Sequence, residues 1–183
     1  AGDWSSLVTA ADAGADSVYF AVKGTNLRHG ASNFDILEIP KVMRLLREKG
    51  VRGYLALNVT AFDSELEKLR DIIQKARESL VDAVIAWDMG VLAMARQAGM
   101  KVHLSTQASV SNFMSLKAYS ELGAERVVLA RECSLSQIKS MAGRCSDENV
   151  ACGIEVFVHG AMCVSISGRC FLSQLTYGRS ANR

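Results

Sequence analysis

Two cysteines near the end of the chain are the residues with the clearest chemical potential. Cys163 and Cys170 stand seven positions apart in a stretch rich in glycine and serine. Thiolates bind zinc and iron–sulfur clusters, and such sites ordinarily use four protein ligands. The chain also holds Cys133, Cys145 and Cys152, but no C-x-x-C pair. Spacing alone leaves two interpretations open: small buried side chains, or part of a metal or cluster site.

Polar residues follow successive apolar runs along the chain. In α/β folds, functional residues gather at the C-terminal ends of parallel strands. Any one of these residues alone is explained as a helix cap or as a buried group bonded to backbone. Together they favour a shared polar site, and they are Asn58, Asp88, Gln107, Arg131, Glu132 and His159.

Glu155 and His159 are two further candidates, both on the last predicted strand. In an extended strand both side chains share one face with Phe157 and stand about 13 Å apart. This separation excludes joint binding of one metal ion, although both can line one cavity. The alternative for Glu155 is an ion pair with an arginine. A turn after His159 can also bring its imidazole to Cys163, which is the pairing that a cysteine nucleophile needs.

The elements that must position these residues alternate between strand and helix. The strands are continuous apolar runs, which is typical of parallel strands covered on both faces. An open doubly wound sheet and a (β/α)8 barrel both fit this pattern. No G-x-G-x-x-G follows the first strand, and the units are short and regular, so the barrel is favoured. Strands are predicted at 16–22, 51–59, 82–87, 102–105, 126–130 and 153–158, and helices at 36–49, 63–79, 91–97, 113–122 and 134–141.

Length and composition set the remaining bounds. A chain of 183 residues supports one domain, but a complete barrel needs ~250 residues. We therefore expect a TIM-barrel-like domain that is incomplete, with about six βα units. The net charge of +2 neither argues for nucleic acid nor excludes it. No apolar run is long enough to span a membrane. An odd number of cysteines fits a secreted disulfide scaffold poorly, so a reduced, cytoplasmic setting is expected.

Two phrases resemble the signature of the collagenase-like peptidase family U32. One is E-V-F-V-H-G-A-M-C at 155–163, and the other is S-G-R-C-F-L-S at 167–173. The family signature combines a Glu, an aromatic residue, a Gly–small–aliphatic–Cys phrase, a Gly-x-Cys and a Ser. Five further stretches resemble the family's other motifs: 1–4, 26–34, 103–107, 129–132 and 178–183. The resemblance therefore covers the whole chain.

The resemblance implies a single barrel-like domain over 1–183 that is a fragment of a longer chain. Some members of the family were described as peptidases or collagenases of unassigned catalytic type. Others take part in oxygen-independent hydroxylation of tRNA uridine, rRNA cytidine or the ubiquinone ring. In several members four cysteines hold a 4Fe–4S cluster. Cys163 and Cys170 match the first two, the other two would follow Arg183, and Cys133 stands where relatives usually carry an aliphatic residue.

Three functions follow as hypotheses. The first is hydroxylation of RNA by an iron–sulfur enzyme, with Cys163 and Cys170 as cluster ligands. The substrate cavity would then be lined by Asn58, Gln107, Arg131, Glu155 and His159, and RNA phosphates would meet Arg28, Arg169, Arg179 and Arg183. The second is a peptidase acting on peptide substrates, although the chain has no G-x-S-x-G or H-E-x-x-H. The third is a non-enzymatic maturation or partner-binding subunit.

Overall fold

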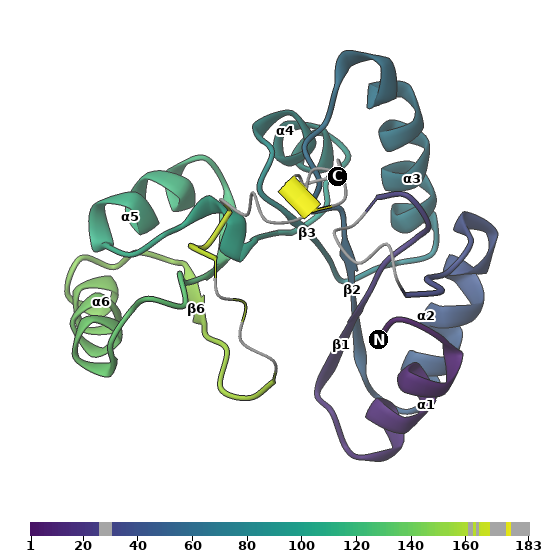
Figure 1. Cartoon of the computed structure of the whole chain (residues 1–183), viewed down its shortest axis with the longest axis horizontal. Coiled ribbons are helices and arrows are strands. Elements are labelled where there is room, and N and C mark those ends of the chain that lie inside the picture. Colours follow the sequence, from purple (N-terminus) through teal and green to yellow (C-terminus); the bar gives the residue numbers. More distant parts are fainter. Residues whose placement is uncertain (26–30, 161–162, 164, 169–174, 177–183) are drawn as a thin grey trace. The chain divides into compact units, whose positions relative to one another are not determined.

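The computed structural model of the chain describes residues 1–25, 31–160, 163, 165–168 and 175–176. The chain forms two compact units, one over Ala1–Lys101 and one over Val102–Asn182. In both units strands and helices alternate along the sequence (Figure 1). Each unit therefore has its own sheet segment and its own helices.

The first unit has three strands, each paired in parallel with the next. Helix α2 packs closely on β2, because a Cβ added to Gly53 would stand only 2.4 Å from Met43 Sδ. Pro40 lies in the first turn of this helix, where a missing backbone N–H costs nothing. The elements are α1 (Trp4–Asp12), β1 (Ser17–Phe20), η1 (Ile36–Glu38), α2 (Ile39–Glu48), β2 (Arg52–Ala56), η2 (Asp63–Glu65), α3 (Leu66–Glu78), β3 (Ala83–Ala86) and α4 (Met89–Gln97).

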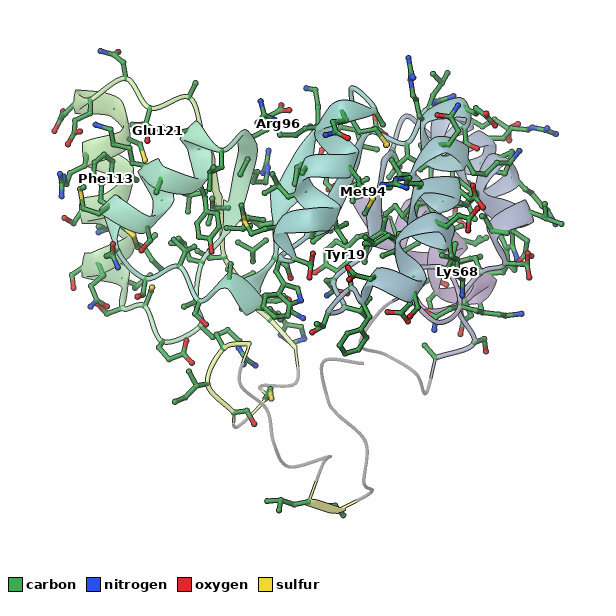
Figure 2. The ribbon with its side chains drawn as sticks, turned by 90° about the horizontal axis from the view of Figure 1, so that it is seen from above. Tyr19, Lys68, Met94, Arg96, Phe113 and Glu121 are labelled. Atoms are coloured by element: carbon green, nitrogen blue, oxygen red, sulfur yellow. The ribbon has the colours of Figure 1, made fainter. Side chains whose placement is uncertain are left out.

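The second unit repeats the pattern with three more parallel strands. Its two long helices contact each other, and the Arg144 guanidinium carbon of α6 stands 4.0 Å from the ring centroid of Phe113 on α5, which Figure 2 labels. Ser134 begins α6 with a reciprocal capping box to Gln137. The elements are β4 (Val102–Leu104), η3 (Thr106–Ala108), α5 (Phe113–Glu121), β5 (Ala124–Val128), α6 (Leu135–Asp147) and β6 (Gly153–Glu155).

The expected α/β alternation with six strands is confirmed among the described residues. The helix over Trp4–Asp12 was not predicted, because it buries only Leu7 and Ala11 and so carries a weak apolar pattern. Asp3 is its N-cap and accepts the backbone N–H of Ser6 at 2.7 Å. The predicted strand over 153–158 was too long, since β6 ends at Glu155, where its neighbour β5 also runs out. Phe157 and His159 therefore do not continue a strand face with Glu155.

None of the helices in the described parts of the chain combines the length and the apolar character that crossing a membrane requires.

Candidate functional site

The second unit gathers several of the candidate residues around Arg131, which follows strand β5. The Arg131 guanidinium donates to the carbonyl oxygens of Cys163 at 3.4 Å and of Ser165 at 2.8 Å. The backbone N–H of Arg131 donates to Ser167 Oγ at 3.3 Å. We call Cys163 together with residues 165–168 the cysteine segment. Arg131 therefore holds this segment at the carboxyl end of β5.

Glu132 holds the same segment through Ser167, a residue with no exposed surface. One carboxylate oxygen accepts the Ser167 backbone N–H at 2.8 Å, and the other accepts its hydroxyl at 2.9 Å. The backbone N–H of Ser167 is the main cause that lowers the pKa of Glu132 below its ordinary value. The carboxylate is thus ionised and engaged in two charge-assisted hydrogen bonds at neutral pH.

The cysteine segment also contacts η3, the short helix that follows β4. Ser109 donates its hydroxyl to the carbonyl oxygen of Ser167. Gly168 adopts a φ of +67°, and a Cβ added there would stand 2.1 Å from the carbonyl oxygen of Gln107. Only glycine allows this approach of backbone to backbone. Residues 105–109, 131–132 and the cysteine segment therefore form one packed polar cluster within the second unit.

The contact between Glu132 and Ser167 is expected to depend on pH. Because folding lowers the pKa of Glu132, its contribution is fully present above the ordinary carboxyl pKa and is lost as the pH falls through the lowered value. Hydrogen exchange of the Ser167 amide, corrected for the intrinsic rate, should therefore speed up in acid. Glu132→Gln should raise that exchange at neutral pH by roughly tenfold, the worth of one hydrogen bond, and remove most of the pH dependence.

Glu148→Gln is the matched control, since Glu148 pairs with Lys117 and Arg144 and has no described contact with Ser167. Equal Ser167 protection in the wild type and in Glu132→Gln at neutral pH would contradict the assignment.

The thiol of Cys163 differs from the other described thiols. It is exposed, and the backbone N–H of Ser165, followed by the Arg131 side chain, lowers its pKa. Burial instead raises the pKa of Cys133 and Cys145, and raises that of Cys152 to about 11. Among the described thiols, the surroundings of Cys163 are therefore the ones that favour the thiolate, the form that a metal ligand or a nucleophile uses, whereas the other three are suited to structural roles.

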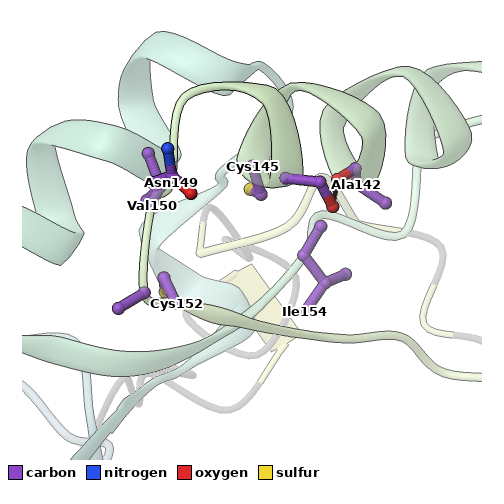
Figure 3. A pocket seen from close by; sticks show the side chains of 8 residues that line it. Ala142, Cys145, Asn149, Val150, Cys152 and Ile154 are labelled. Atoms are coloured by element: carbon purple, nitrogen blue, oxygen red, sulfur yellow. Dashed lines mark hydrogen bonds between the residues drawn. The ribbon is translucent and has the colours of Figure 1, made fainter.

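Cys145 and Cys152 line an open hollow of about 480 Å³ beside α6 and β6 (Figure 3). Its wall also includes Asn149, Val150 and Ile154. Among the described residues no three His, Cys, Asp or Glu side chains are placed to hold a metal ion. Because burial keeps these two thiols protonated, the hollow lacks an activated group.

Glu155 and His159 have no described side-chain hydrogen bond to this cluster, and the side chain of Gln107, a member of the cluster, has a partner of its own. Glu155 pairs with Arg126 at 3.9 Å, which is the alternative role that the sequence left open for it. Gln107 accepts the Ser105 hydroxyl through its side-chain oxygen. His159 is exposed in a bend after β6. No described hydrogen bond joins His159 to Cys163.

The first unit carries the remaining described candidate, Asn58, after β2. Asp88, after β3, is a helix cap: its carboxylate accepts the backbone N–H groups of Gly90, Val91 and Ala61. Trp87 lies directly before Asp88, and its indole nitrogen is buried with no described hydrogen-bond partner. The side-chain oxygen of Asn58 is likewise buried with no described partner. Trp87 was not predicted as a site residue, because an aromatic residue at a strand end is typical of the core.

Several predicted site residues lie outside the described residues. They are Cys170, the second proposed ligand, and the four arginines expected at RNA phosphates, Arg28, Arg169, Arg179 and Arg183. Their roles remain sequence-based predictions.

Comparisons with known proteins agree with the resemblance seen in the motifs. The family model of peptidase family U32 matches residues 2–183. A collagenase of Porphyromonas gingivalis is 39% identical over 190 residues, which is 100% of this chain and 45% of that protein. The tRNA hydroxylation protein P1 of Bacillus subtilis is 36% identical over 185 residues, covering 100% and 43%. A 23S rRNA 5-hydroxycytidine synthase of Escherichia coli is 36% identical over 170 residues, covering 93% and 25%. The chain thus spans less than half the length of each of these relatives.

Solved structures show the fold. The U32 peptidase Mk0906 superposes with a TM-score of 0.59 at 15% identity, covering 77% of this chain and 60% of that one. A D-psicose 3-epimerase gives 0.52 at 10% identity, covering 86% and 80%. With the parallel strands described above, these likenesses confirm the α/β, TIM-barrel-like fold.

Proposed function

Because the chain belongs to peptidase family U32, we propose that it is part of an enzyme that hydroxylates a pyrimidine base of RNA and that contains a 4Fe–4S cluster. Relatives named for tRNA hydroxylation and for 5-hydroxycytidine synthesis in rRNA support the substrate class. The observation that carries the proposal is Cys163, an exposed thiol with a lowered pKa on a segment held by Arg131 and Glu132.

The surroundings of Cys163 fit a cluster ligand. Thiolates, not thiols, bind iron, and the Ser165 backbone N–H together with Arg131 favours the thiolate. Cys163 and Cys170 would provide two ligands, and two more would come from the rest of the protein. When bound, such a cluster supplies electron transfer. Arg131, Glu132 and Ser167 then orient the ligand, because they fix the segment before any metal binds. A reduced, cytoplasmic setting is part of the same proposal, since such clusters and free thiols need it.

The test is iron and sulfide analysis of the whole protein after anaerobic reconstitution, with its absorption spectrum. We expect bound iron and sulfide in the wild type and a large loss in Cys163→Ala and Cys170→Ala. Cys133→Ala and Cys145→Ala serve as matched controls and should retain the iron. Deletion of the gene should also remove one hydroxylated pyrimidine nucleoside from tRNA or rRNA. A colourless wild-type protein, or an unchanged nucleoside profile, would overturn the proposal.

A peptidase is the second candidate, because the Porphyromonas gingivalis relative is named a collagenase. It would use the Cys163 thiolate as nucleophile. This candidate predicts gelatin cleavage by the metal-free protein that is lost in Cys163→Ala and retained in Cys170→Ala. The cluster proposal predicts that both variants behave alike.

A further inference from the structure

Asn58 and Trp87 follow two adjacent strands of the first unit, β2 and β3. Strands β2 and β3 pair in parallel with Ala56 opposite Ile85, and the Leu57 N–H donates to the Ile85 carbonyl at 2.9 Å. Both strands end before the two residues, but the Leu57 bond carries the ladder beyond Ala56, and the same register extended by two residues would set Asn58 opposite Trp87. Continued alternation of side chains would put both on the face that buries Tyr54, Ala83 and Ile85. This position is the carboxyl end of two adjacent strands, where α/β folds of this type bind their ligands.

Each of the two side chains carries a buried polar atom without a described hydrogen-bond partner. These atoms are Oδ1 of Asn58, an acceptor, and Nε1 of Trp87, a donor. A buried polar atom without a partner destabilises the fold, so native structures rarely keep one. The nearby carboxylate of Asp88 does not relieve it, since that group serves three backbone N–H groups. Two such atoms in one register position indicate groups reserved for a ligand.

The pairing of one acceptor with one donor defines the ligand chemistry. The ligand must present a donor and an acceptor next to each other on one edge. A trans peptide points its N–H and C=O in opposite directions and does not match. The Watson–Crick edge of a nucleobase matches: in uracil, N3–H lies beside a carbonyl oxygen, and in cytosine the amino group lies beside N3.

We propose that Asn58 Oδ1 and Trp87 Nε1–H form a subsite that binds the Watson–Crick edge of an unpaired pyrimidine base. This subsite rests on the proposed function and deepens it, because in that function the base belongs to the RNA substrate. The occupied edge excludes base pairing, so the target nucleotide must be single-stranded or flipped out of a helix when it binds.

The test is calorimetric titration of the whole protein with uridine 5′-monophosphate and cytidine 5′-monophosphate. Of the two nucleotides, the one that binds the wild type more tightly should bind each site variant about tenfold more weakly. The variants are Asn58→Leu, which removes the acceptor, and Trp87→Phe, which keeps an aromatic ring but removes the N–H. N3-methyluridine 5′-monophosphate, whose edge is blocked, should bind about as weakly as ribose 5-phosphate. The fluorescence difference between wild type and Trp87→Phe should change when the nucleotide binds.

Trp4→Phe is the matched control, because the Trp4 indole N–H already donates to Glu38 at 2.9 Å. It should leave nucleotide affinity unchanged. Because Asn58→Leu removes an atom that has no described partner, its unfolding midpoint should not fall. The inference is overturned if neither nucleotide binds, if the two site variants bind like wild type, or if Asn58→Leu lowers the midpoint. Nucleotide binding that needs Asn58 and Trp87, combined with an unchanged nucleoside profile after gene deletion, would instead overturn only the proposed function.

Discussion

Replacing Gly168 with alanine is expected to detach the cysteine segment from the second unit. The added Cβ would stand 2.1 Å from the Gln107 carbonyl oxygen and 3.0 and 3.1 Å from the carbon and Cα of the same residue. All three are backbone atoms that cannot rotate aside. The φ of +67° adds ~1–2 kcal/mol of strain for any side chain. The clash adds to this strain, and both oppose the hydrogen bonds that hold Ser167 in place.

Hydrogen exchange of the Ser167 amide measures this detachment directly. In Gly168→Ala we expect most of the protection at Ser167 to be lost, while the amides of β4 and β5 keep theirs. The iron content of the reconstituted whole protein should fall with it. Gly143→Ala is the control, because Gly143 lies within α6 with nothing within 4 Å of an added Cβ. Full Ser167 protection in Gly168→Ala would show that the segment is held elsewhere.

Replacing Phe34 with alanine is expected to cost the first unit about 3–5 kcal/mol of unfolding free energy, the usual cost of removing a buried phenylalanine. Phe34 is 1% exposed, and its ring makes edge contacts with Trp4 and Phe20 at centroid distances of 5.2 and 5.9 Å. Its backbone also pairs with Ala21 and Lys23 beyond the end of β1. The side chain thus joins α1, β1 and the loop before η1.

Denaturant unfolding followed by tryptophan fluorescence reports on this unit, because Trp4 and Trp87 both belong to it. Leu37→Ala is the matched control, since Leu37 is 77% exposed and should change the midpoint little. A loss below about 1 kcal/mol in Phe34→Ala would contradict the central role of this ring.

The strands and most helices could be predicted because their apolar patterns are strong. Helix α2 shows this well, with Ile39, Val42, Met43 and Leu46 buried at helical spacing. The boundaries were less predictable where few residues of an element are buried. Helix α6 was predicted to end at residue 141, but it continues to Asp147 even though Met141 is its only buried residue. The sequence of such a surface helix has little apolar periodicity, so its end is hard to predict.

Only some of the site residues could likewise be predicted from the sequence. The motif around Cys163 and the polar residue Arg131 could be selected from residue type and position. Their partner Ser167 could not, because its value comes from a fold that buries it against Glu132. Trp87 was also missed, since only the structure shows that its indole nitrogen is buried without a described partner. Residue type predicts which side chains can take part in chemistry. Burial and hydrogen bonding, which only the structure shows, decide which of those side chains are already held by a partner.

The contrast among the described thiols has a practical consequence for studying the protein. Alkylating reagents react with thiolates, so the order of reaction follows pKa and exposure. Cys163 is exposed with a lowered pKa, whereas Cys152 is buried with a pKa of about 11. With Cys170 replaced by serine, a maleimide spin label at neutral pH should therefore attach first to Cys163. One resonance line shape would then report how tightly Arg131 and Glu132 hold the segment, in a protein with all its other cysteines left in place.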